Sequence, residues 1–201
     1  MYVANGGSGA WSLPEPKGAD TAGSDEVYIA DGAGSGAWGP ISNTSTSPTG
    51  WEYYKDGAAA QSFGTTASRL SIDGVTSEIT TYQPSGVTNM WDVTTDEILA
   101  TGLGDSYLIR LDLPVTAKGG SPNKLVLQMD IGGGATPSNV IVSREIGVSG
   151  TPPYDVSVSY GFFSLSTFVA NNAQFFLNTD AGTIDITQPA IFIQRISGAV
   201  L

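Results

Sequence analysis

The chain of 201 residues contains neither cysteine nor histidine. Without cysteine no disulfide bond can form, so the sequence carries no mark of an oxidising or a reducing compartment. The same two absences exclude Ser-His-Asp and Cys-His catalytic arrangements and zinc sites built from the usual ligands. We therefore expect no catalytic residues, no metal site and no cofactor, with a calcium site of aspartates and loop carbonyls as an open alternative.

Basic residues are scarce as well. Eight lysines and arginines stand against 19 aspartates and glutamates, which gives a formal net charge of −11. The eight are spread thinly along the chain, so neither nucleic acid nor an anionic membrane is an expected partner. No run reaches the ~18 apolar residues of a membrane helix. The first residues lack the basic and apolar regions of a signal peptide, which disfavours secretion by the usual route.

Turn-forming residues are abundant, and short alternating runs lie between them. The chain has 26 glycines and 11 prolines, and only 13% of its residues are charged, about half the ~25% of ordinary soluble domains. Residues 124–131 and 154–162 alternate apolar and polar side chains, which predicts strands buried on one face. The sequence predicts an all-β fold, a jelly-roll sandwich of about eight to ten antiparallel strands, over residues 50–201.

The same pattern gives approximate strand boundaries. Strands are expected over residues 51–54, 69–72, 77–82, 106–113, 124–131, 139–146, 154–163, 174–177, 183–186 and 190–196. The strand that begins at Ser106 is expected to end at Pro114, which has no N–H to donate. Residues 96–100 fit either one helical turn capped by Thr95 or another strand.

An internal repeat occupies residues 1–41. The sequence YVANGGSGAW, from Tyr2 to Trp11, returns as YIADGAGSGAW from Tyr28 to Trp38. Asn-Gly and Asp-Gly favour tight hairpin turns, so each copy is expected to form a small strand-turn unit. Two such units cannot bury a core alone, and the recurring aromatics favour docking on a partner over the alternative of a flexible glycine-rich tail. Residues 42–49, SNTSTSPT, are interpreted as the linker to the 50–201 domain.

Paired carboxylates are the remaining route to catalysis, as in glycosidases. The nearest candidates are Glu97 with Asp105 and Asp130 with Glu145. Nothing in their spacing marks them, and surface carboxylates are far commoner than catalytic ones. We expect the protein not to be an enzyme.

Several segments together resemble a known class of proteins. They are Trp91-Asp92, residues 104–110 (GDSYLIR), residues 125–133 (LVLQMDIGG), residues 168–172 (FVANN) and residues 191–196 (IFIQRI). This succession resembles the trimeric jelly-roll modules of bacteriophage virion proteins, which are similar in fold to tumour-necrosis-factor and C1q head domains. The resemblance implies display on a particle, as capsid decoration, head fibre or tail fibre, and implies no catalytic residues. The chain lacks the long shaft of a typical tail fibre, which favours a compact decoration protein.

Three hypotheses follow. The first is a homotrimeric decoration protein (cement or head fibre) that is made in the host cytoplasm and lies on the virion surface. It would bind the major capsid protein or another virion component through Tyr2, Trp11, Tyr28 and Trp38. The second hypothesis, and the main alternative, is a receptor-binding tip or short tail fibre that recognises a host surface glycan or protein. The third and weakest hypothesis is a carboxylate-based glycosidase.

The expected trimer rests on strands with apolar residues on both faces. Phe192 and Ile196 lie on the face opposite Ile191 and Ile193, and a strand that is apolar on both faces is buried on both. A neighbouring subunit would supply the second cover. Tyr160, Phe162, Phe192 and Ile196 are the residues expected at the trimer interface.

Overall fold

The computed structural model describes residues 3–4, 11–12, 26–30, 36–40 and 49–197, with side chains described for 49–197. The chain divides into two compact units, residues 1–45 and residues 46–201.

The first unit contains two antiparallel strand pairs. Strand β1 (Val3–Ala4) pairs with β2 (Trp11–Ser12), and β3 (Glu26–Ala30) pairs with β4 (Gly36–Pro40). Each copy of the sequence repeat therefore corresponds to one strand pair, as its Asn-Gly or Asp-Gly turn predicts.

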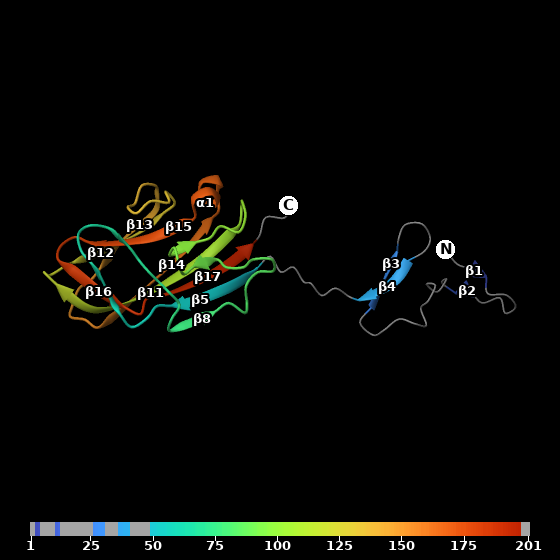
Figure 1. The fold of residues 1–201 in the computed structure, drawn as a ribbon, viewed down its shortest axis with the longest axis horizontal. Coiled ribbons are helices and arrows are strands. Elements are labelled where there is room, and N and C mark those ends of the chain that lie inside the picture. The colour runs from blue at the N-terminus through green and yellow to red at the C-terminus, as the bar shows by residue number, and fades with distance from the viewer. Residues whose placement is uncertain (1–2, 5–10, 13–25, 31–35, 41–48, 198–201) are drawn as a thin grey trace. The chain divides into compact units, whose positions relative to one another are not determined.

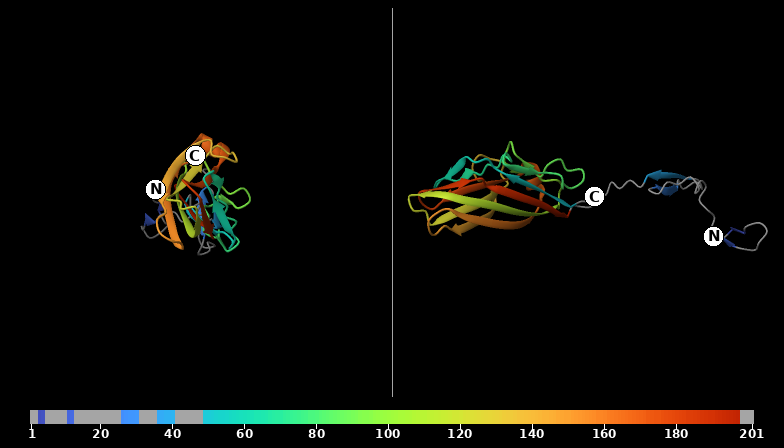
Figure 2. Two further views of the ribbon diagram at one scale, coloured as in Figure 1. Left: turned by 90° about the vertical axis from the view of Figure 1, so that its left-hand side faces the viewer. Right: turned by 90° about the horizontal axis from the view of Figure 1, so that it is seen from below.

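The second unit is a sandwich of two antiparallel sheets (Figure 1). Sheet I has the order β13 (Val140–Gly147), β12 (Lys124–Asp130), β15 (Ala173–Thr179), β10 (Glu97–Ile98) and β9 (Trp91–Asp92), with β7 (Ser68–Arg69) also on β15. Sheet II has the order β6 (Ala60–Phe63), β16 (Thr183–Thr187), β11 (Ser106–Gly119), β17 (Ala190–Ser197), β5 (Gly50–Lys55) and β8 (Ser77–Ile79), with β14 (Tyr154–Phe163) also on β11. Figure 2 shows the two layers from the end and from below. The predicted all-β jelly-roll sandwich is confirmed.

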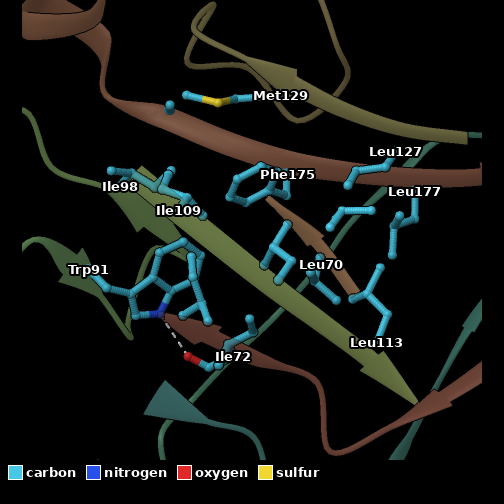
Figure 3. Close-up of a cluster of buried hydrophobic side chains, with 14 of the residues drawn as sticks. Leu70, Ile72, Trp91, Ile98, Ile109, Leu113, Leu127, Met129, Phe175 and Leu177 are labelled. Carbon is cyan, nitrogen blue, oxygen red and sulfur yellow. Dashed lines mark hydrogen bonds between the residues drawn. The ribbon is translucent and has the colours of Figure 1, made fainter. Parts of the chain in front are cut away.

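The core lies between the two sheets and is built from the inward positions of alternating strands. Along β11 the buried residues are Tyr107, Ile109, Leu111, Leu113 and Val115, at every second position. They meet the inward residues of β12 and β15, such as Leu127, Met129, Phe175 and Leu177 (Figure 3).

Trp91 closes one side of this core. Its ring is fully buried, and its indole N–H donates a hydrogen bond to the carbonyl of Ile72 at 2.9 Å. A buried indole needs such an acceptor, because an unpaired N–H away from water is costly.

Strand β11 does not end at Pro114, and that prediction is wrong. On one edge Pro114 pairs with Asp155 of β14. On the other edge the partner changes from β17 at Asp112 to β16 at Val115. Pro114 thus lies where the second edge has no partner residue, so its missing N–H interrupts no ladder there.

Three elements were not predicted from the sequence: strand β6, strand β9 and a short helix, α1 (Ser166–Asn171). The open alternative at residues 96–100 is also decided, because residues 97–98 form a strand and not a helical turn. In the part of the chain that is described, no helix combines the length and apolar character needed to cross a membrane.

Candidate functional site

The residues predicted to attach to a virion fall mainly on the N-terminal strand pairs. Trp11 lies in β2, Tyr28 in β3 and Trp38 in β4, and the register places Tyr28 opposite Trp38. Tyr2 lies outside the described residues. Their role in attachment stays a prediction.

The four carboxylates considered for catalysis each have a structural partner. Glu97 accepts a hydrogen bond from Asn172 Nδ2 at 3.1 Å and one from Gln174, and Asp105 accepts one from Arg195 Nη2 at 2.9 Å. Asp130 accepts hydrogen bonds from backbone amides of the loop that follows it, and Glu145 lies 2.7 Å from Lys124 Nζ. Among the residues described, no three or more acidic side chains gather as a metal site would require.

Several aromatic side chains gather on the outward side of sheet II. Successive side chains of a strand point to opposite faces, so Glu52 and Tyr54 of β5 are buried while Trp51 and Tyr53 point outward and are half-buried. Phe192 of β17 pairs with Tyr53 and is likewise half-buried.

Contacts among these rings explain why they are half-buried instead of fully exposed. Trp51 stacks on Tyr82 with ring centroids 4.8 Å apart, and the Trp51 and Phe192 centroids are 5.6 Å apart. The guanidinium of Arg110 lies 5.8 Å from the Phe192 ring centroid, in a cation–π contact. The aromatic face is defined here as Trp51, Tyr53, Tyr82, Leu108, Phe192 and Ile196. Tyr82 and Ile196 are half or more exposed.

Sequence reasoning found two members of this face, Phe192 and Ile196, and missed the others. Trp51 and Tyr53 fall in a predicted strand, but the run Gly-Trp-Glu-Tyr-Tyr-Lys does not show which side is inward. The usable signal was the spacing of two between Trp51 and Tyr53, which places both on one face.

The four residues predicted at the trimer interface do not share one surface. Tyr160 and Phe162 lie on the inward side of β14 and pack against the core. Phe162 stacks on Tyr107 with centroids 5.2 Å apart and meets Phe168 edge-on at 5.3 Å. The alternation along β14 has only one apolar face, and that face is used within the chain. Phe192 and Ile196 are the members of the set that point outward.

Comparisons with known proteins give no family. No family model matches the chain, and no curated protein matches it. Among solved structures, the chain is similar to the Eiger TNF of S. frugiperda at 8% identity and TM-score 0.45, covering 76% of this chain and 94% of that one. It is similar to the PRD1 vertex protein P5 at 12% identity and TM-score 0.45, covering 97% and 91%. It is also similar to a chain of Broad Bean Stain Virus at 14% identity and TM-score 0.32, covering 75% and 84%. These likenesses are too low to carry an argument, so the fold rests on the strand order above.

Proposed function

We propose that this protein is a structural virion protein, a homotrimeric decoration protein of the cement or head-fibre type. It lies on the virion surface after synthesis in the host cytoplasm. Residues 1–41 attach it to the major capsid protein or another virion component, and the sandwich forms the trimer. It performs no catalysis and needs no cofactor.

The aromatic face of sheet II is the observation that carries this proposal. Trp51, Tyr53 and Phe192 gather on the outside of a sheet whose other side is already the core. Clustered exposed apolar side chains mark interaction surfaces, because a single chain in water gains little from them. A second and a third copy that cover this face would bury it.

The trimer can be tested by replacing Phe192 with serine. Phe192 points outward, so the fold should survive, while the lost contact should shift the chain from trimer to monomer at low micromolar concentration. Burial of a phenylalanine side chain contributes roughly 1.5–3 kcal/mol per subunit. Sedimentation equilibrium measures the shift. Val140→Ser on β13, also an exposed apolar residue, is the control and should leave the trimer intact. A wild-type protein that sediments as a monomer would contradict the proposal.

Attachment can be tested by comparing residues 50–201 with the full chain. The shorter chain keeps every strand of both sheets, so it should fold and trimerise. It should no longer bind virus particles assembled without this protein, because the aromatic residues of the repeat are absent. Co-sedimentation with such particles gives the readout. Equal binding by both chains would place the attachment site in the sandwich.

One observation favours the alternative of a glycan-binding tip. Tyr82 is 57% exposed and is held flat against Trp51, and exposed aromatic rings are suited to stacking on sugar rings. In that case Tyr82→Ala would abolish binding to host cell-surface glycans and leave the sedimentation of the protein unchanged. A loss of trimers instead would assign Tyr82 to the subunit interface.

A further inference from the structure

The usual pattern of burial is reversed at the C-terminal end of strand β14. In Phe163-Ser164-Leu165 the serine is fully buried, whereas the phenylalanine is 69% exposed and the leucine 66% exposed. Apolar residues usually occupy the buried positions of such a run. Here the backbone aims the two large apolar side chains at solvent and the small polar one at the interior.

Hydrogen bonds hold this arrangement in place. The N–H of Gly104 donates to the carbonyl of Ser164 at 2.7 Å, and the N–H of Ser164 donates to the carbonyl of Asp105 at 2.8 Å. The Ser164 hydroxyl donates to the carbonyl of Gly102. Leu103 lies between the bonded residues of this loop and is 60% exposed. The exposed side chains therefore stand on a fixed backbone.

Helix α1 adds a fourth apolar side chain. The N–H of Val169 donates to the carbonyl of Leu165 at 3.0 Å, and Val169 is 41% exposed. The end patch is defined as Leu103, Phe163, Leu165 and Val169. The charged residue nearest in sequence, Asp105, is fully buried and pairs with Arg195 at 2.9 Å. The patch is thus apolar and uncharged.

Phe163, a member of the end patch, lies at the same end of the sandwich as Gly50, as the strand register shows. Gly50, the first residue of β5, pairs with Arg195 near the end of β17, and Ser106 pairs with both Ser197 and Phe163.

The loops at the opposite end have a different composition. Residues 64–67, 120–123, 149–153 and 180–182 contain only Gly, Ala, Ser, Thr, Pro, Asn and Asp, and no exposed large apolar side chain lies among them. These four loops therefore differ from the end next to Gly50, which carries the end patch.

We propose that the end patch is a second docking contact with the same virion component that residues 1–41 bind, on an uncharged apolar part of that component's surface. The inference rests on the proposed function. A partner held by residues 1–41 is tethered to Gly50 through residues 42–49, which span at most about 28 Å when extended. Tethering raises the effective concentration of the second contact, so a small patch adds substantially to overall binding.

Two other partners for the end patch, a neighbouring copy of the chain and a membrane surface, fit the structure less well. The aromatic face, offered to neighbouring copies, is formed by outward side chains of β5, β11 and β17 together with Tyr82, whereas the patch is formed by loop 102–105, the end of β14 and α1. A membrane surface with anionic lipids would repel a chain of net charge −11.

The test uses the full chain with Leu103→Ser and Leu165→Ser together. The probe is virus particles assembled without this protein. The proposed contact would bury both leucines, and each would contribute roughly tenfold or more to affinity. Losing both is therefore expected to weaken binding about 100-fold. The control is Val75→Ser with Val140→Ser, which removes two exposed apolar side chains outside the patch and should leave binding unchanged. Thermal midpoint and sedimentation should be unchanged in both variants, because all four side chains face solvent.

The outcomes separate this inference from the proposed function. If wild type binds the particles and the patch variant binds equally well, the patch proposal is wrong while the proposed function stands. If wild type does not bind the particles, the proposed function fails and the patch proposal fails with it. A change in sedimentation of the patch variant alone would assign the patch to contacts between copies. Binding of wild type, but not the variant, to phosphatidylcholine vesicles would assign it to lipid, and either result overturns the proposal.

Discussion

Replacing Arg195 with methionine is expected to lower the free energy of unfolding by about 3–5 kcal/mol, the usual cost of breaking a buried ion pair from one side. Arg195 Nη2 lies 2.9 Å from Asp105 Oδ1, and the side chains are 12% and 0% exposed. Methionine has a similar length but no charge. It leaves the Asp105 carboxylate in the interior without its cation, which is costly in a medium that screens charge weakly.

Urea denaturation at one fixed protein concentration measures this loss, because oligomer formation makes apparent stability depend on concentration. Lys124→Met is the matched control. It breaks the ion pair with Glu145, whose side chains are 50% and 62% exposed, and exposed pairs contribute about 0–1 kcal/mol. If the two variants lose similar amounts of unfolding free energy, the Asp105–Arg195 pair contributes no more to stability than an exposed ion pair does.

Much of the fold could be predicted because most strands show a clear period of two. Strand β14 has the predicted bounds, residues 154–163, and its apolar side is the inward side. In β17 the fully buried Ile191 and Ile193 and the outward Phe192 and Ile196 follow the two apolar faces seen in the sequence. Alternation fixes which side chains share a face, so these assignments needed no tertiary information.

Other features depended on contacts between distant segments and left no local signal. The interpretation of Pro114 as a strand end failed because proline is tolerated where an edge lacks a partner, and that depends on where β16 and β17 lie. The exposure of Phe163 and Leu165 is set by hydrogen bonds between Ser164 and residues 102–105. Composition alone would have placed both large side chains inside.

Buried charges are the clearest case of missing information in the sequence. In β5 the run Gly-Trp-Glu-Tyr-Tyr-Lys places Glu52 and Tyr54 on one face and Trp51 and Tyr53 on the other. A charged residue in a strand usually marks the solvent-exposed face, yet Glu52 is fully buried. Its position depends on donors from residues 83–91, more than 30 positions away in sequence.

Replacing Glu52 with alanine is the last prediction, and it is expected to lower the free energy of unfolding by about 3 kcal/mol, because buried donors left unpaired cost roughly 1–3 kcal/mol each. The carboxylate accepts hydrogen bonds from Tyr54 Oη at 3.0 Å, Gln83 Nε2 at 2.6 Å, Met90 N at 2.8 Å and Trp91 N at 3.2 Å. It thereby fixes residues 83–91 to β5. Glu78→Ala, at an exposed position of β8, is the control and should cost little.

The pH dependence of this loss has a definite sign. Burial raises the pKa of Glu52 above its ordinary value of 4.5, and the hydrogen bonds from Met90, Gln83, Tyr54 and Trp91 lower it without cancelling the effect. Because the folded pKa exceeds the unfolded one, the stabilisation by Glu52 is full below pH 4.5 and decreases as pH rises through the folded pKa. The difference in unfolding free energy between wild type and the Glu52→Ala variant should therefore be larger at pH 5 than at pH 8. A difference that grows with pH would mean that the hydrogen bonds outweigh burial, and that Glu52 stabilises the fold chiefly as an ion.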